Sequence, residues 1–332
     1  MFKKTVFLLA LSLFLRADGA FAASYLLYLE AQGVGGYASQ ENKAISYSMD
    51  AMDAMQKPGI GFDYLQRFSG ETGDWGSLAI QGRLVYSQGF DENNGDEAQP
   101  QLYNAFFKYK AGIADLWVGH NRIPFGLGSY LDSHALLLQP LDMRGYGYDR
   151  DWGVGASHDF QWGDAALALS TGSGMPVYFQ GNYLVTGRVS KGVLSRDNYN
   201  IGLSTAVGEP LDTMGYEKVM PDPVKTLLFG SDLTYLWGRL ENRLEAAAGE
   251  RDQQETYAVL YRFGVNFLPE DRLKLEAQPV YKKMYGEAGY EISGAVTYKL
   301  TSDITLRGMY TYDDVFNDNR VVFQLYWYHR VL

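Results

Sequence analysis

Stretches in which apolar and polar residues alternate recur along most of the chain. In Thr256–Phe267, one face carries tyrosine, valine and phenylalanine at every second position, whereas the other mixes alanine and leucine with Arg262 and Asn266. Side chains alternate across a β-strand, so this pattern predicts strands with one apolar and one mixed face. About sixteen such stretches lie between Tyr25 and Val331, with turn-forming residues between them. The predicted strands are Tyr25–Tyr37, Gly59–Phe68, Trp75–Ser87, Gln101–Ala111, Leu116–Phe125, Asp151–Phe160, Ala165–Thr171, Asn182–Lys191, Asn198–Val207, Thr226–Trp237, Leu240–Gly249, Thr256–Phe267, Leu273–Tyr285, Tyr290–Leu300, Ile304–Tyr312 and Arg320–Val331.

The segments between these strands alternate between short and long. Short connections such as Gly112–Asp115 and Gly238–Arg239 are followed by longer, mostly more acidic ones such as Gln88–Pro100 and Gly208–Lys225. An even number of strands with short turns at one end and longer loops at the other is typical of an outer-membrane β-barrel. A soluble β-sandwich would bury the same apolar faces against each other, but it gives no reason for this alternation. We therefore predict an all-β fold, a transmembrane antiparallel barrel of about sixteen strands.

One long connection, Gly126–Arg150, differs from the others because much of it is apolar. Unstructured loops of this length are uncommon in compact domains and usually have a function. We expect the loop to fold inward against the barrel wall and narrow the pore, although a subunit interface would also bury it. The expected constriction residues are Asp132, His134, Asp142 and Arg144.

Alternation also assigns charged side chains to the lumen face of the strands. The candidate pore-lining residues are Arg67, Arg83, Lys108, His120, Arg122, Arg188, Arg243, Arg262, Lys274 and Arg307. The first four strands after the N-terminal one carry a run of bases, which we call the basic arc: Arg67, Arg83, Lys108 and Arg122. Charged walls select ions by sign, so the arc would favour anions. We further hypothesise that Asp132 and Asp142 face the arc and create a transverse field; the alternative is an ordinary solvated wall without selectivity.

The first residues have the features of a secretory signal. Lys3 and Lys4 precede a short apolar run, and a small-x-small cleavage pattern ends at Ala22. We therefore predict a signal peptide at 1–22 and a barrel domain at 23–332. The chain has no cysteine, which leaves no disulfide framework, thiolate metal site or haem attachment motif. We expect no cofactor and no nucleic-acid partner, and we expect a bilayer with lipopolysaccharide in the outer membrane of a Gram-negative bacterium as the surroundings.

The segment Gly119–Gly126 reads Gly-His-Asn-Arg-Ile-Pro-Phe-Gly, and Arg150–Val154 reads Arg-Asp-Trp-Gly-Val. Together they resemble the phosphate-selective porin family, in which a strand ending in Pro-Phe-Gly precedes the long inner loop and an Arg-Asp-x-Gly-Val strand follows it. The resemblance implies a sixteen-stranded, commonly trimeric barrel that passes small anions. We therefore expect a porin for passive diffusion of small hydrophilic solutes or ions, with a preference for anions.

Two other functions fit a barrel. One is a sheath around a partner such as a multihaem cytochrome, which would have to be supplied in trans because the chain carries no haem motif. The other is a barrel enzyme with a catalytic group on its outer rim. None of the four histidines lies in a recognisable nucleophile motif, so we expect no enzyme activity.

Overall fold

The computed structural model describes residues 22–48, 56–71, 73–88, 97–214, 217–218 and 220–332. The signal peptide predicted at 1–22 therefore lies outside the described residues except for its last position. Within the described part of the chain, no helix has the length and apolar character needed to cross a membrane.

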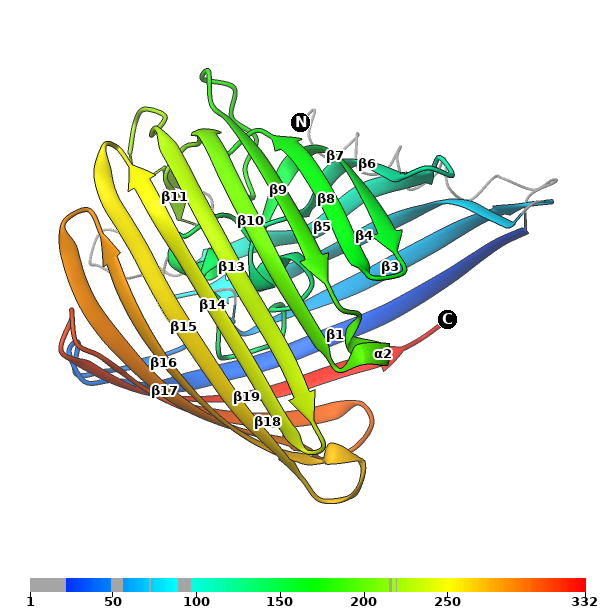
Figure 1. Ribbon diagram of the computed structural model, residues 1–332. Helices are drawn as coiled ribbons and strands as arrows, with labels where there is room; N and C mark the ends of the chain where they lie inside the picture. Colours follow the sequence, from blue (N-terminus) through cyan, green and yellow to red (C-terminus); the bar gives the residue numbers. More distant parts are fainter. Residues whose placement is uncertain (1–21, 49–55, 72, 89–96, 215–216, 219) are drawn as a thin grey trace.

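Sixteen strands form the wall of a closed barrel in the described residues (Figure 1). They are β1 (Ala22–Ala38), β3 (Gly59–Gly70), β4 (Gly73–Ser87), β5 (Glu97–Lys110), β6 (Asp115–Arg122), β7 (Arg150–Phe160), β8 (Gly163–Ser170), β9 (Tyr183–Lys191), β10 (Tyr199–Glu209), β13 (Thr226–Trp237), β14 (Leu240–Arg251), β15 (Gln254–Phe267), β16 (Leu273–Met284), β17 (Glu287–Lys299), β18 (Ile304–Asp313) and β19 (Asp318–Arg330). Each coincides with one of the predicted stretches, and the predicted fold class is confirmed.

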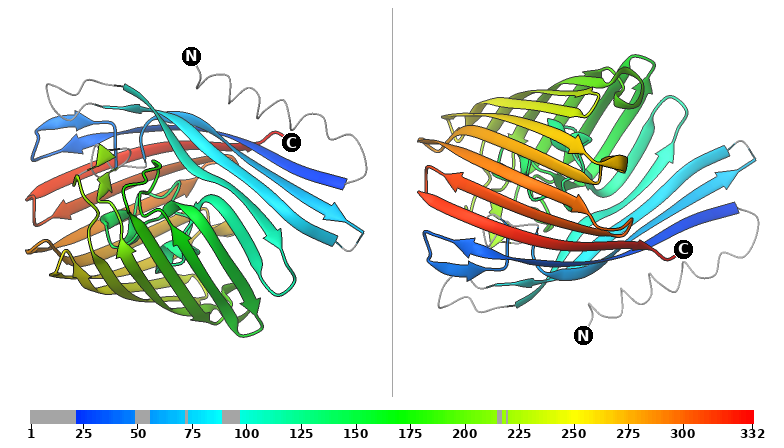
Figure 2. Two further views of the ribbon diagram at one scale, coloured as in Figure 1. Left: turned by 90° about the horizontal axis from the view of Figure 1, so that it is seen from above. Right: turned by 90° about the horizontal axis from the view of Figure 1, so that it is seen from below.

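Antiparallel pairing runs around the whole ring and closes it. β1 pairs with β3 on one side and with β19 on the other, where Tyr28 lies opposite Arg330 and Ala38 opposite Arg320. Figure 2 shows β1, in blue, and β19, in red, side by side at the seam. Closure leaves no free sheet edge, which is the condition for a β-structure to cross a bilayer.

Three short strands add to this wall. β2 (Lys43–Ile45) extends the sheet at the end of β1. β11 (Thr213–Met214) and β12 (Glu217–Lys218) form a small ribbon of their own within the connection from β10 to β13. Sequence alternation gave no sign of these elements, because two or three residues are too few to show a period.

The two faces of the wall differ as the alternation predicts. Along β10, Leu203 is exposed on the outside whereas Ser204 is buried inside. Along β19, Phe323 and Leu325 are exposed outside, and Gln324 between them is buried inside. Exposed leucine, valine and phenylalanine around the whole outer surface would be costly in water, and this is the arrangement expected of a lipid-facing surface.

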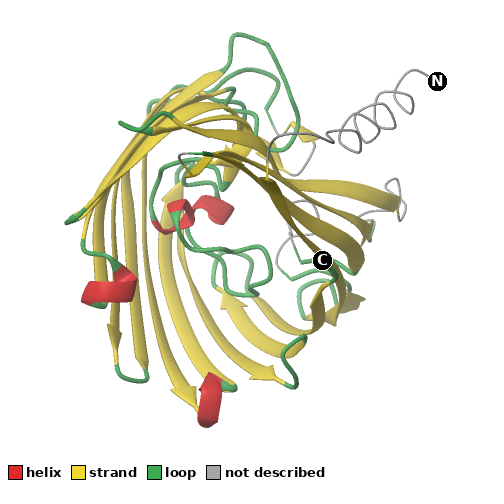
Figure 3. Ribbon diagram, turned by 90° about the vertical axis from the view of Figure 1, so that its right-hand side faces the viewer, coloured by secondary structure: helices red, strands yellow, loops and turns green. Residues whose placement is uncertain are grey.

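The connections at the two ends differ in length. Tight turns such as Gln161–Trp162 and the one-turn helix α2 (Leu194–Asp197) lie at the end that also holds the C-terminus (Figure 1). The longer segments lie at the other end, which we call the outer end. One of them does not extend outward: the chain from 123 to 149 runs into the barrel, where it contains the short helices η1 (Leu127–Ser129) and η2 (Asp142–Arg144) (Figure 3).

Candidate pore constriction

The chain from 123 to 149, which we call the inner loop, turns inward directly after β6. Gly126 has a φ of 53°, in the left-handed region that favours glycine. A Cβ at this position would also overlap the carboxylate of Glu245 on the opposite wall. The glycine of the Pro-Phe-Gly motif therefore lets the chain leave the strand and approach the far side of the barrel.

Apolar side chains hold the inner loop against one side of the wall. Phe125, Leu127, Leu141 and Tyr146 are buried and form one cluster with inward-facing residues of β9, β10 and β13 to β16. The wall residues of this cluster are Leu184, Ala206, Leu228, Ala247, Ala258, Leu260 and Val280. Each large side chain buried in this way contributes about 1.5–3 kcal/mol. The loop is thus docked and is not suspended in the lumen.

Glu245 on β14 fixes the two ends of this docked stretch. Its Oε1 accepts a hydrogen bond from the backbone N–H of Leu127, and its Oε2 accepts one from Leu141, both at 2.9 Å. The side chain is fully buried. Both backbone N–H groups, which are buried with the loop, thereby gain an acceptor. One wall residue therefore clamps two points of the loop that are fourteen residues apart.

The middle of the loop is tied to the opposite side of the barrel through His134. Its Nε2 lies 2.7 Å from Oε2 of Glu30 on β1, and Arg83 on β4 donates to its carbonyl oxygen at 3.0 Å. Arg83 also holds Glu30 in a bidentate pair, and the hydroxyl of Tyr326 on β19 donates to the same carboxylate. Burial and the nearby Arg83 cation lower the pKa of His134. The imidazole is therefore neutral near pH 7.

Further contacts join the second half of the loop to β15, β16 and β17. Arg262 donates to the carbonyl of Leu138 at 3.0 Å, and Gln278 donates to the carbonyl of Gln139 at 3.0 Å. Arg144 makes a bidentate ion pair with Glu291 on β17. Together with the Glu245 and Glu30 contacts, these bonds fasten the loop to walls on both sides of the barrel, so it crosses the lumen.

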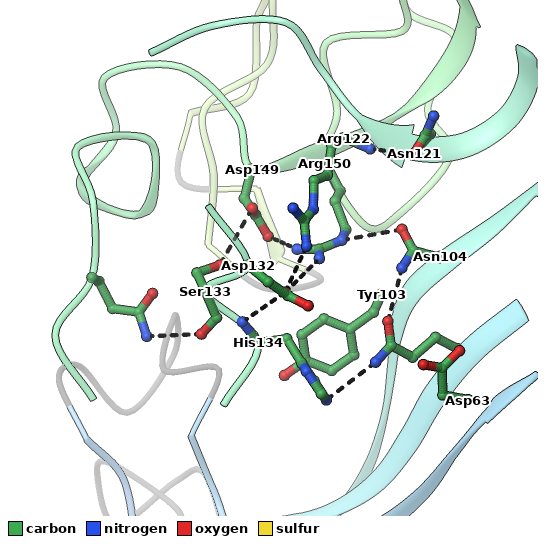
Figure 4. Close-up of polar contacts among 12 residues, drawn as sticks. Asp63, Tyr103, Asn104, Asn121, Arg122, Asp132, Ser133, His134, Asp149 and Arg150 are labelled. Carbon is green, nitrogen blue, oxygen red and sulfur yellow. Dashed lines mark hydrogen bonds and ion pairs between the residues drawn. The ribbon is translucent and has the colours of Figure 1, made fainter. Parts of the chain in front are cut away.

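Asp132 is the loop carboxylate that remains accessible. Its side chain is 56% exposed, and its Oδ1 lies 2.6 Å from Arg122 and 3.5 Å from Arg150. Figure 4 shows the carboxylate beside both guanidinium groups, with the ring of Tyr103 nearby. Burial alone would raise the pKa of Asp132, but Arg122, His134 and Arg150 outweigh it and hold the pKa below its ordinary value. The charged form of Asp132 therefore lies against Arg122 of the basic arc.

Asp142 lies elsewhere. It is buried inside the fold of the loop, where one carboxylate oxygen packs against Gly128 and has no hydrogen-bond partner among the described residues. Burial, Asp149 and Glu245 raise the pKa of Asp142 well above its ordinary value. Asp142 is thus shielded from the lumen, and the structure does not place it across from the basic arc.

The predicted lumen cations occur mostly in ion pairs. Arg83 pairs with Glu30, Arg188 with Asp232, and Lys108 with Asp115 at 3.7 Å. Arg243 and Lys274 both contact Glu241, at 2.9 Å and 3.0 Å. Arg67, Arg262 and Arg307 have no carboxylate partner among the described residues: Arg67 is exposed, Arg262 is buried, and Arg307 donates to Gln324 at 2.9 Å.

Four of the predicted pore-lining residues are buried and offer little surface to the lumen: Arg83, His120, Arg188 and Arg262. His120 is the most completely enclosed of them. Its side chain is fully buried, its Nδ1 lies 3.1 Å from the carbonyl oxygen of Tyr103, and its ring packs 5.2 Å from that of Trp152. His120 is therefore enclosed by protein and contributes no surface to the lumen.

Several residues that position the loop were not among the predicted site residues. Glu30 and Glu245 were recognisable only as inward-facing acids, because nothing local marks an acid as an anchor for a distant loop. Tyr130, whose hydroxyl donates to Asp232 at 3.2 Å, and Arg150 were likewise not singled out. The available signal for where the loop docks was the presence of apolar residues, such as Leu228 and Leu260, on the mixed faces of the strands. A water-filled lumen alone does not explain apolar residues on those faces.

Comparison with known proteins identifies the architecture. OmpT of Vibrio cholerae in its trimer form matches with a TM-score of 0.64 and 11% identity, over 93% of this chain and 100% of that chain. OmpF of Salmonella typhi in complex with daunomycin matches with a TM-score of 0.61 and 10% identity, over 92% and 97%. The anion-selective porin of Comamonas acidovorans matches with a TM-score of 0.59 and 11% identity, over 93% and 100%.

These matches establish the fold as that of the β-barrel porins of the Gram-negative outer membrane. The matched porins are of several kinds, so they do not single out the phosphate-selective family. No protein-family model matches the sequence, and the search of curated proteins gave no match. Within the described residues, no group of three or more histidine, aspartate or glutamate side chains could hold a metal ion.

Proposed function

We propose that the protein is an outer-membrane porin through which small hydrophilic solutes diffuse passively, with Gly126–Arg150 as its constriction. The observation that carries this proposal is the inner loop, which crosses a closed, lipid-compatible barrel and is bonded to both walls. A loop held this firmly sets the width of a passage rather than opening and closing it freely. No step in such diffusion requires a nucleophile, metal or cofactor, and we assign none.

We further propose a weak preference for small anions. Arg67 and Arg307 face the lumen side of the wall without a carboxylate partner among the described residues, whereas the buried acid Glu245 is enclosed by the loop. Most of the other lumen cations are neutralised by neighbouring acids, which limits the field that a passing ion meets. Paired cations also argue for a general anion preference over phosphate specificity.

The experiment is single-channel recording in a planar bilayer under a tenfold salt gradient. The proposal predicts a stable conductance and a small reversal potential of the sign that indicates anion permeation. A preference for cations would keep the pore but reject the assignment of Arg67 and Arg307. Absence of conductance from folded protein would reject the proposed function.

The protein would act in a bilayer whose outer leaflet contains lipopolysaccharide, and we propose a homotrimer as its assembly, since OmpT of Vibrio cholerae is described in a trimer form. The sheath function is less well supported, because a protein partner could not thread a lumen that the inner loop crosses. A haem band in the purified complex would favour the sheath nevertheless.

A further inference from the structure

A cavity of about 470 Å³ lies on the outer side of the inner loop, between the loop and the outer ends of β16 to β19. The loop contributes Leu137, Met143 and Tyr146 to its lining, and the outer turns after β16 and β18 contribute Tyr285 and Phe316. Its volume is in the range of sites that bind small molecules. A solute entering from the outer end would reach this cavity before the constriction.

Apolar side chains form most of the lining surface. Three methionines, Met143, Met284 and Met309, lie there together with the aromatic rings of Tyr146 and Phe316. The interior of a water-filled pore is expected to be polar, so a continuous apolar surface requires an explanation. Methionine and aromatic side chains together bind flat or irregular apolar groups well, because the thioether adapts its shape and contacts rings favourably.

The cations in the lining are already neutralised. Arg144 is paired with Glu291, Lys282 with Asp313 at 3.2 Å, and Arg320 with Asp318 at 2.5 Å. Asp212, a fourth acid in the lining, is in turn paired with Arg251 at 3.3 Å. The cavity therefore presents no unpaired positive charge from these residues to a solute.

One acid in the lining differs from the rest. Glu287, at the start of β17, is exposed, and its carboxylate has no ion pair or hydrogen bond with another described residue. The remaining charge at the cavity is therefore negative. Tyr146, Tyr285 and Phe316 add ring faces, which also attract cations.

We propose that this cavity binds an amphipathic organic cation, with its apolar part against the methionines and its charged group near Glu287 and the aromatic rings. The site would hold such a solute before it passes the constriction, so the inference rests on the proposed function for its biological use. The binding itself is independent of conduction and can be measured separately.

The test is isothermal titration calorimetry of the folded, detergent-solubilised barrel with benzyltrimethylammonium as the probe. We expect saturable binding, with affinity weakened about fivefold by Glu287→Gln, which removes one nearby charge. Phe316→Ala removes a ring face and should weaken binding about threefold. Glu250→Gln and Phe179→Ala are matched controls, since both residues are exposed and lie outside the cavity lining; they should leave the affinity unchanged.

Two further probes separate the parts of the proposal. Tetramethylammonium carries the charge without the ring, and benzoate carries the ring with the opposite charge; both should bind much more weakly. Equal binding of benzoate, or an unchanged affinity in Glu287→Gln, would overturn the proposal. If the barrel bound the cation but showed no conductance, the binding site would be supported and the proposed pore rejected. If the barrel conducted but did not bind the cation, the pore would be supported and the binding site rejected.

Discussion

Asp132 is a solvent-exposed carboxylate of the inner loop that contacts cationic side chains of the barrel wall. It neutralises Arg122 and approaches Arg150, and it is more than half exposed. Removing its charge releases Arg122 toward the lumen. At the residue scale, Asp132 is therefore the exposed loop carboxylate that balances cations of the neighbouring wall.

We predict that Asp132→Asn increases the preference for anions, raising the anion-to-cation permeability ratio about two- to threefold. The reversal potential under a salt gradient measures this ratio. Asp142→Asn is the matched control, because Asp142 is buried within the loop and should leave the ratio unchanged. Equal shifts in the two variants would contradict the assignment.

His134 is expected to make the docking of the inner loop depend on pH. Burial and Arg83 lower its pKa in the docked loop, so the docked state binds the proton less readily than a free imidazole does. Docking is therefore fully favourable above the ordinary imidazole pKa and weakens as the pH falls through it. We predict larger current fluctuations at about pH 5 than at about pH 7.5.

The variant His134→Gln separates this effect from the titration of other groups. Its current fluctuations should change little over the same pH range, because no imidazole remains at the Glu30 contact. If the variant responded to acid as strongly as the unmodified protein, His134 would not be the responsible group.

At the element scale, the strands were predictable and the path of the loop was only partly so. Alternation placed all sixteen wall strands, because lipid on one face and water on the other impose a period of two. The bulge between Gln81 and Gly82, which shifts the register against Leu102 and Asn104, is not visible in the pattern. Alternation counted from Lys108 would turn Gln101 and Tyr103 outward, but both are buried, because the extra residue of the bulge shifts the phase of β5.

The inner loop was recognisable from its length and its apolar residues. The wall residues that anchor it were not recognisable from the sequence. Glu245 is separated from Leu127 by more than one hundred residues, and no spacing rule relates them. His120 was misjudged for the same reason: its burial depends on the backbone of Tyr103 and the ring of Trp152, which tertiary structure brings together. Contacts between distant elements decide such positions, and a single sequence does not encode them visibly.

We predict that Glu245→Ala loosens the inner loop. The substitution leaves two buried N–H groups without acceptors, at a cost of about 2–4 kcal/mol. Amide hydrogen exchange in the peptides covering 127–141 should accelerate at least about thirtyfold. Glu255→Ala, which removes an exposed acid paired with Lys283, serves as the control. Unchanged exchange in Glu245→Ala would show that the clamp does not hold the loop.

At the scale of the whole molecule, the outer surface and the lumen face different surroundings and carry different side chains. The outside exposes apolar side chains to lipid, and the inside keeps charges in pairs around a docked loop. Leu203, 63% exposed near the middle of β10, lies on the lipid side. We predict that Leu203→Arg lowers the free energy of unfolding from vesicles by about 2–4 kcal/mol, measured by urea titration.

Leu203→Ala is the control for that substitution and should cost less, since it removes apolar area without placing a charge in lipid. Equal effects of the two substitutions would indicate that this face of β10 is not embedded in a bilayer.

The central claim is that the inner loop sets the width of a conducting pore. The most direct measurement compares single-channel conductance of the unmodified barrel with that of a variant in which residues 128–147 are replaced by a short glycine-serine linker. Heat-dependent electrophoretic mobility would first establish that both are folded. We predict a stable conductance for the unmodified protein and one several-fold larger for the variant. Equal conductances would show that the loop does not form the constriction.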